Sequence, residues 1–358
     1  MKMTKATYHL LLRFVAGVAA SLILVGAVAM LEQNGSKDLY KNAAGVRTES
    51  TVMTVNGQDI SAEEYLYWLS YYCDYYNEYL GYMGITDWNM ELSEGFTAGD
   101  YITQQAEMQA ISMVTQYAVI DGWAQEGGIS MTEEDLADID AQRAASIEQL
   151  GGEKAYQQWL QSLGVSDAFI SRSLSHSYLI NHLSDAYCTE GGAIYPDEES
   201  LNAYIDEHEF FGASILFVDT CEMDKTEKTK AKKEMEGYVT KLRKAKDLDA
   251  AFAEIAEKLE LDPASITFTA DEMEEGFIAG LKKVKIGSVS DVITTDEGYY
   301  VAIRRQPELE SILQGMLNEE FADRCANAEI IYNDEVYGSI NTLTFYKKLL
   351  AARGIPVT

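Results

Sequence analysis

The chain has 358 residues and a net charge of −30 at neutral pH. This acidity excludes nucleic acids and other polyanions as partners, because phosphate contacts require Lys and Arg side chains. The four cysteines are far apart and form no CxxC pair, so the sequence predicts neither a common zinc site nor a dense disulfide framework.

An uninterrupted apolar run occupies residues 14–30, after a flank that contains Lys2, Lys5 and Arg13. Its length is close to the roughly 20 residues that cross the core of a bilayer. Basic flanks stay on the cytoplasmic side, so the rest of the chain is predicted to lie outside the cytoplasm.

Two interpretations of this run remain open. The small residues Ala27, Val28 and Ala29 fit a signal-peptidase site, which would release the body of the protein. We favour a retained, single-pass membrane anchor in residues 1–30, because apolar residues extend back to Leu10 and make the segment long for a signal peptide.

The remaining sequence divides into four stretches by composition and pattern. Residues 31–50 are polar and contain Gly, and are predicted to form a linker. Residues 51–210 are mostly helical in pattern, residues 211–306 follow a β-α-α-β-α-β-β order, and residues 307–358 return to helix. Helices on both sides of the α+β stretch must bury their apolar faces, so we expect the C-terminal segment to pack on helices before residue 208.

Capping residues and periodicity predict where the elements lie. Before residue 210 we expect a β segment at 52–55, a helix opened by Ser61, and helices at 98–127, 132–150, 153–163, 166–187 and 196–208. After it we expect strands at 213–218, 266–268, 289–293, 298–304 and 330–332, and helices at 225–246, 248–259, 272–283, 309–326 and 337–353.

The helix that begins after Ser61 carries an aromatic stripe, with rings spaced three or four residues apart: Tyr65, Trp68, Tyr72, Tyr75, Tyr76 and Tyr79. Such a stripe is most often the core of a helical domain. The alternative is an open groove for unfolded chains, since Tyr combines a large apolar face with a polar tip. The candidate groove residues are Tyr65, Trp68, Tyr72 and Tyr76.

Several motifs resemble the SurA/PrsA-type exported foldases. In the helical part these are Val55-Asn56-Gly57 before Ile60-Ser61, the stretch Gly128–Leu136, and the stretch Trp159–Ser166. In the α+β part, Met273, Phe277, Gly287, Val289-Ser290-Asp291 and Gly298-Tyr299 resemble a PpiC-type parvulin prolyl isomerase domain. The resemblance implies an α+β fold: a mainly helical SurA N-terminal-like chaperone domain, a parvulin-like domain inserted in it, and one N-terminal transmembrane helix.

The α+β part departs from the family at its active site. The family's His on the first strand corresponds to Ser214, and its second His, on the last strand, corresponds to Tyr300. The family's Gly-Gly-Asp-Leu-Gly stretch is missing, and the loop at residues 262–265 is short. Ser214 and Tyr300 are either a substitute hydrogen-bonding pair, since each hydroxyl donates and accepts, or inert replacements, which we favour.

Met273 and Phe277 line the proline pocket in the family. Their spacing of four residues predicts that they share one helix face, and the alternative to substrate binding is plain core packing.

We therefore expect a membrane-anchored, extracytoplasmic chaperone that binds unfolded exported polypeptides, with a weak or inactive isomerase domain. The rivals are an active prolyl isomerase with a substituted site and a dedicated envelope scaffold. No cofactor, no metal and no nucleic acid is expected, and the sequence predicts no particular oligomeric state.

Overall fold

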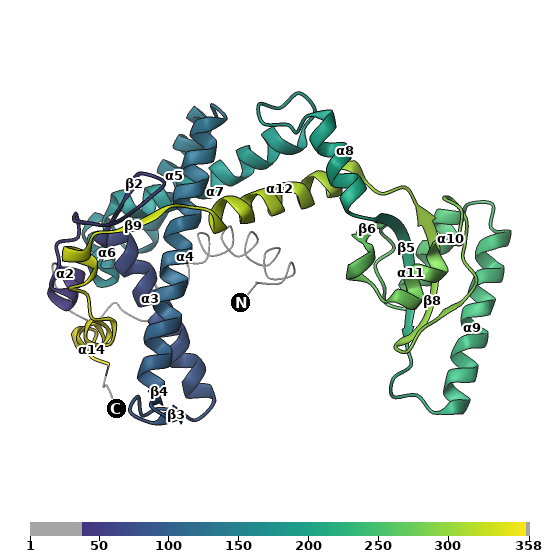
Figure 1. Ribbon diagram of the computed structural model, residues 1–358, viewed down its shortest axis with the longest axis horizontal. Coiled ribbons are helices and arrows are strands. Elements are labelled where there is room, and N and C mark those ends of the chain that lie inside the picture. Colours follow the sequence, from purple (N-terminus) through teal and green to yellow (C-terminus); the bar gives the residue numbers. More distant parts are fainter. Residues whose placement is uncertain (1–37, 356–358) are drawn as a thin grey trace. The chain divides into compact units, whose positions relative to one another are not determined.

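The computed structural model describes residues 38–355 (Figure 1). This part of the chain divides into two compact units, one formed by residues 38–194 with residues 318–355 and the other by residues 195–317. The apolar run predicted to be a membrane anchor, residues 14–30, lies outside the described residues. Among residues 38–355, no helix is long and apolar enough to cross a membrane.

The first unit is mostly helical. Its elements are α2 (Leu39–Ala44), β1 (Thr51–Val55), β2 (Gln58–Ser61), α3 (Ala62–Tyr82), β3 (Glu91–Ser93), β4 (Phe96–Thr97), α4 (Ala98–Glu126), α5 (Glu133–Gln149), α6 (Glu153–Leu163), α7 (Asp167–Cys188), β9 (Ile330–Tyr332), α13 (Asp334–Tyr337) and α14 (Thr342–Ala352). The helix α12 (Leu309–Ala326) contributes to both units.

Side-chain caps fix the beginnings of the long helices. The hydroxyl of Ser61 accepts a hydrogen bond from the backbone N–H of Glu64 at 3.2 Å, which confirms the predicted start of α3. Thr97 with Asp100 forms a capping box at α4, and Thr132 with Asp135 forms one at α5. These side chains satisfy backbone N–H groups that the first turn of a helix leaves without partners.

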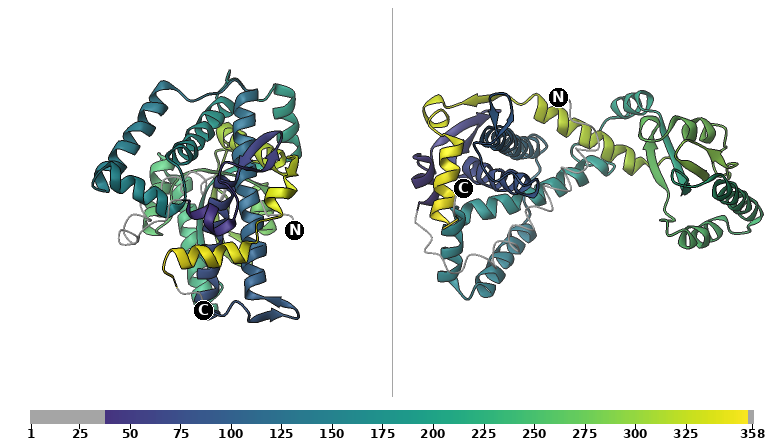
Figure 2. Two further views of the ribbon diagram at one scale, coloured as in Figure 1. Left: turned by 90° about the vertical axis from the view of Figure 1, so that its left-hand side faces the viewer. Right: turned by 90° about the horizontal axis from the view of Figure 1, so that it is seen from below.

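The C-terminal segment completes the first unit. Strand β9 pairs antiparallel with β1, and α14 packs on α2, α3 and α4. Figure 2 shows this yellow C-terminal helix beside the purple and dark-blue beginning of the described chain. Phe345, Tyr346 and Leu349 are spaced at helical intervals and are buried in this contact. Helix α14 thus packs on helices that lie before residue 208 in the sequence, whereas residues 309–317 of the C-terminal segment belong to the second unit.

Several features of the first unit were not predicted, among them β2, the division of the helix expected at 337–353 into α13 and α14, and the two that follow. The stretch expected to be a linker contains α2, whose Leu39 and Tyr40 are buried, and the Tyr40 hydroxyl lies 3.0 Å from the hydroxyl of Ser70. The loop between α3 and α4 contains the short antiparallel hairpin β3–β4. Both elements are too short to show a clear period in the sequence.

The second unit is an antiparallel sheet covered on both faces. Its strands are β5 (Phe210–Asp219), β6 (Ile266–Thr269), β7 (Ile293–Thr294) and β8 (Gly298–Arg305), in the order β6-β5-β8-β7. Its helices are α8 (Glu198–Glu207), α9 (Lys225–Lys244), α10 (Leu248–Lys258) and α11 (Glu275–Leu281). One face of the sheet packs on α9 and α10, and the other packs on α11.

The order of elements follows the predicted β-α-α-β-α-β-β pattern, with two corrections. The helix expected at 272–283 is reduced to α11 and is preceded by a 3₁₀ turn at Ala270–Glu272. The strand expected at 289–293 is reduced to β7 and a single bridge between Val289 and Ile303.

Candidate functional site

Ser214 and Tyr300, whose hydroxyls the sequence suggested as a hydrogen-bonding pair, lie on opposite faces of the sheet. Tyr300 packs with Phe277 on the α11 face, together with the side chains of Ala213 and Ile215. Ser214 lies between these two residues on β5, so its side chain points to the opposite face, toward α9 and α10. The structure therefore does not bring Ser214 and Tyr300 together. The β5 residues on the face of Tyr300 are Phe211, Ala213, Ile215 and Phe217.

Ser214 has a structural partner on its own face. It is buried, and its hydroxyl accepts a hydrogen bond from Nε of Arg305 at 3.3 Å. The guanidinium of Arg305 also pairs with the carboxylate of Asp249 at the start of α10. Ser214 thus helps hold the end of β8 against α10.

Tyr300 is the centre of a polar cluster on the α11 face. Its hydroxyl donates a hydrogen bond to the carboxylate of Glu274 at 3.0 Å, and the hydroxyl of Thr295 donates to the same oxygen at 2.8 Å. Burial, and then the hydrogen bond to Glu274, raise the pKa of Tyr300 well above its ordinary value, so the phenol stays neutral. Both hydroxyls of the cluster already donate to Glu274, and the cluster contains no imidazole and no activated nucleophile.

Met273 and Phe277 do not share a helix face. Met273 is extended and precedes α11, whereas Phe277 lies inside that helix. Phe277 has no exposed surface, and its ring centroid is 4.8 Å from that of Tyr300 and 6.1 Å from that of Phe268. Its environment is that of a core residue. Met273 is only partly buried and is the one of the two that a ligand can reach.

The aromatic stripe of α3 is likewise mostly core. Tyr65, Trp68 and Tyr72 are 1%, 1% and 8% exposed, and Tyr76 is half-buried. The ring of Trp68 contacts the rings of Tyr72 and Tyr117 at 6.3 and 5.7 Å. Three of the four candidate groove residues therefore stabilise the unit from inside.

The exposed rings lie further along the same hairpin of α3 and α4. Tyr75 and Tyr79 are 52% and 44% exposed, and the ring of Tyr75 is 5.0 Å from that of Tyr76, which contacts Tyr101 at 5.8 Å. We call these four side chains, Tyr75, Tyr76, Tyr79 and Tyr101, the tyrosine face. Further apolar residues of the hairpin are strongly exposed, among them Tyr82 at the end of α3 and Met108 on α4.

The sequence contained a signal for this face. Tyr75, Tyr79 and Tyr82 continue the stripe of Tyr65, Trp68 and Tyr72 at the same intervals of three and four residues. Because this spacing is the same along the whole stripe, the period alone does not show where along the helix the rings become exposed.

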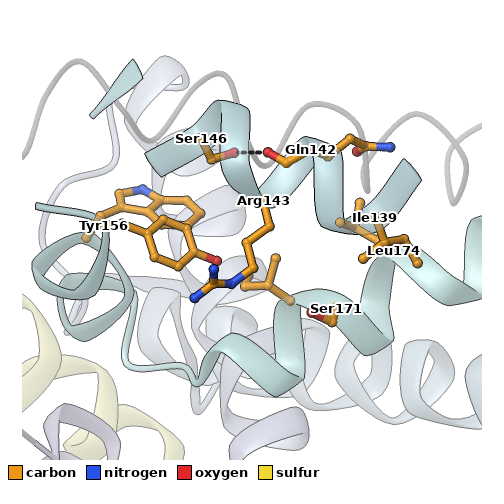
Figure 3. A pocket seen from close by; sticks show the side chains of 9 residues that line it. Ile139, Gln142, Arg143, Ser146, Tyr156, Ser171 and Leu174 are labelled. Atoms are coloured by element: carbon orange, nitrogen blue, oxygen red, sulfur yellow. Dashed lines mark hydrogen bonds between the residues drawn. The ribbon is translucent and has the colours of Figure 1, made fainter. Parts of the chain in front are cut away.

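One cavity in the first unit is lined by residues of α5, α6 and α7 (Figure 3). Its volume is about 10 Å³, which is at most the space of one water molecule. Arg143 contributes to its wall, and its Nε lies 2.7 Å from the carboxylate of Asp167. This cavity is a packing feature that joins three helices, and it is too small for a ligand.

A cluster of charged side chains, of which Glu64 is the most buried carboxylate, joins α3, α4 and α7. Glu64 is 3% exposed, and its carboxylate lies 3.7 Å from the guanidinium of Arg172. Arg172 also contacts Asp121 at 3.2 Å, and Nε2 of His176 lies 3.1 Å from the same carboxylate. Burial, opposed by the charge of Arg172, raises the pKa of Glu64. These contacts join three helices of the first unit, so we interpret the cluster as structural.

Metal-binding and disulfide chemistry find no support in the geometry. Among residues 38–355, no group of three His, Cys, Asp or Glu side chains is placed to hold a metal ion. The four cysteines of this part of the chain, Cys73, Cys188, Cys221 and Cys325, are all free thiols.

Comparison with known proteins gives matches among solved structures alone. No family model matches the chain, and no curated protein matches it. PrsA from Bacillus subtilis is 19% identical, over 67% of this chain and 91% of its own, with a TM-score of 0.32. The foldase protein PrsA from Streptococcus pneumoniae is 18% identical, over 75% of this chain and 95% of its own, with a TM-score of 0.21.

A third matching structure, 12% identical with a TM-score of 0.20, covers 79% of this chain and 99% of its own. It comes from a study of two structurally related SurA-like chaperones of Campylobacter jejuni. The three structures named here are thus two PrsA proteins and one from the study of SurA-like chaperones.

Proposed function

We propose that this protein is a membrane-anchored, extracytoplasmic chaperone that binds unfolded, newly exported polypeptides. The observation that carries the proposal is the exposure of Tyr75 and Tyr79, with Tyr82 and Met108, on the hairpin of α3 and α4. Exposed apolar groups gathered on one element mark an interaction surface. Tyrosine suits variable polypeptide ligands, because it offers a large contact area and a polar tip at low entropic cost.

In this proposal the second unit has the form of a parvulin domain but is weak or inactive in prolyl isomerisation. Catalysis of this rotation requires an apolar pocket for proline and polar groups aimed at the twisted amide. Here Phe277 is buried in the core, and the hydroxyl of Tyr300 is already bonded to Glu274. Both groups are therefore engaged in packing the unit.

The proposal places the body outside the cytoplasm, held by the apolar run at residues 14–30. Its support is the length of the run and the basic flank before it. N-terminal sequencing of the mature protein tests this part. A chain that begins at Met1 or Lys2 supports an anchor, whereas one that begins near Met30 shows that the run is a removed signal.

Site-specific cross-linking tests client binding. A photo-reactive amino acid replaces Tyr79 in one version of the full chain and the exposed Glu148 of α5 in a matched control. Each is irradiated with a model protein that is either folded or held unfolded by reduction and alkylation. We expect cross-links from position 79 to the unfolded form alone, and few from position 148. Equal labelling from both positions, or none from position 79, contradicts the proposal.

A further inference from the structure

The distribution of positive charge in the first unit is uneven. No Lys, Arg or His occurs between Arg47 and Arg143, a stretch that contains all of β1, β2, α3, β3, β4 and α4. The tyrosine face therefore lies on a hairpin that has carboxylates but no cation of its own.

On one side of the hairpin, α14 supplies the missing cations. Arg353 lies 2.7 Å from the carboxylate of Asp74, and Nζ of Lys347 lies 5.7 Å from the centre of the Trp88 ring. Cations held over aromatic rings or beside carboxylates are attracted electrostatically. Within this protein, the acidic aromatic hairpin thus already binds Lys and Arg side chains from another segment.

Another part of the hairpin lacks such a partner. The exposed carboxylates near the ends of α3 and α4 are Glu78, Asp87, Glu91, Glu94 and Asp100. Within the described residues, none of these five forms an ion pair. Tyr75 and Tyr79, four residues apart on α3, lie on a different side of that helix from Asp74, which faces α14.

We propose that the tyrosine face selects client segments in which Lys and Arg alternate with apolar side chains. This inference rests on the proposed chaperone function and names the class of segment that it binds. The apolar side chains cover the exposed tyrosines, the cations lie over the ring faces, and the unpaired carboxylates attract the segment from a distance. Salt screens the attraction of the cations to the ring faces and to the carboxylates, and it leaves the apolar contact with the tyrosines.

Binding of three labelled synthetic peptides to the full chain tests the selectivity. The peptides share length and apolar residues, and their remaining positions are all Lys, all Gln or all Glu. At low salt we expect the Lys peptide to bind about tenfold tighter than the Gln peptide, and the Glu peptide to bind weakest. High salt reduces the difference between them.

Two sets of variants separate local recognition from the overall charge. The triple variant Glu78→Gln, Glu91→Gln, Glu94→Gln should lose most of the preference for the Lys peptide. The triple variant Glu134→Gln, Asp140→Asn, Glu148→Gln on α5, which changes the net charge equally, should keep it. An equal loss in both variants shows attraction to the whole acidic protein and overturns the proposal.

The outcomes also separate this inference from the chaperone function. If the three peptides bind alike and Tyr79 still cross-links unfolded protein, the charge selectivity is wrong and the chaperone function stands. If neither peptides nor unfolded protein bind, both fail.

Discussion

Tyr346 of α14 donates a hydrogen bond to Asp74 of α3 at 2.8 Å, although the two residues are 272 positions apart in sequence. Tyr346 has no exposed surface, and Arg353 pairs with the same carboxylate. This contact locks the last helix of the chain onto the first long one. It explains why the C-terminal segment is part of the first unit.

Loss of the Asp74 carboxylate should destabilise the protein. In Asp74→Ala the buried Tyr346 hydroxyl and the Arg353 guanidinium lose their shared partner, and leaving such groups unpaired costs about 1–3 kcal/mol. Urea unfolding of the first unit measures this decrease in the free energy of unfolding. The exposed Asp140→Ala serves as control, and equal stability of both variants would show that the contact contributes nothing.

The first unit should fold without the second. The hydroxyl of Tyr187 donates to Glu320 at 3.0 Å, so the chain leaves and re-enters the first unit at neighbouring points. A protein in which a short Gly-Ser linker replaces residues 195–317 should therefore unfold cooperatively in urea. A product with native helix content but no cooperative transition would show that the first unit depends on the second.

The buried charge of Glu64 predicts a specific pH dependence. Burial raises its pKa in the folded state above the ordinary 4.5, so the folded protein binds more protons than the unfolded chain between these two values. The contribution of Glu64 to the free energy of unfolding therefore falls as pH rises through this window and is constant above it.

The variant Glu64→Gln imitates the protonated form of Glu64. Comparison with the wild type therefore isolates the contribution of the Glu64 charge to the free energy of unfolding. Its stability should equal that of the wild type below pH 4.5 and exceed it at neutral pH. Urea unfolding of both proteins across this range measures the difference. A variant that is less stable at neutral pH would show that the ion pair with Arg172 outweighs the cost of burial.

Restoring the two histidines of the parvulin family should not restore catalysis. In the double variant Ser214→His, Tyr300→His, the imidazoles would emerge on opposite faces of the sheet, and the first would disturb the contact between Ser214 and Arg305. Isomerisation of an X-Pro peptide, followed by a protease-free spectroscopic assay, should stay near the uncatalysed rate. Ile215→His, Tyr300→His is the informative comparison, since it places both rings on one face.

Local chemistry made the long elements predictable. Ser61, Thr132 and Ser166 mark helix beginnings in the sequence, and the structure has caps at all three. The compact apolar run at residues 213–218 predicted a strand, and β5 includes it.

The roles of the candidate site residues were harder to predict, because tertiary contacts determine where each side chain points and whether it is buried. A spacing of four residues suggested one helix face for Met273 and Phe277, but α11 begins between them. Ser214 and Tyr300 were placed by motif, yet the side-chain direction depends on the register of β5 against β8, where Phe217 and not Ser214 lies opposite Tyr300. The buried and exposed rings of α3 differ only in what packs on them.

The most direct test of the account is suppression of aggregation by the full chain and one pair of variants. Tyr75→Ala, Tyr79→Ala removes two exposed rings while keeping a helix-forming residue at each position. Leu136→Ala removes a side chain of similar exposure on α5 as a control. Light scattering of a chemically unfolded client, with each protein in turn, measures the effect, and circular dichroism checks the fold.

We predict that the wild type and Leu136→Ala slow aggregation equally. The double tyrosine variant, folded and equally stable, should require about tenfold more protein for the same effect, as expected when central aromatic contacts of an interface are lost. Full suppression by the double variant would contradict the assignment of client binding to the tyrosine face.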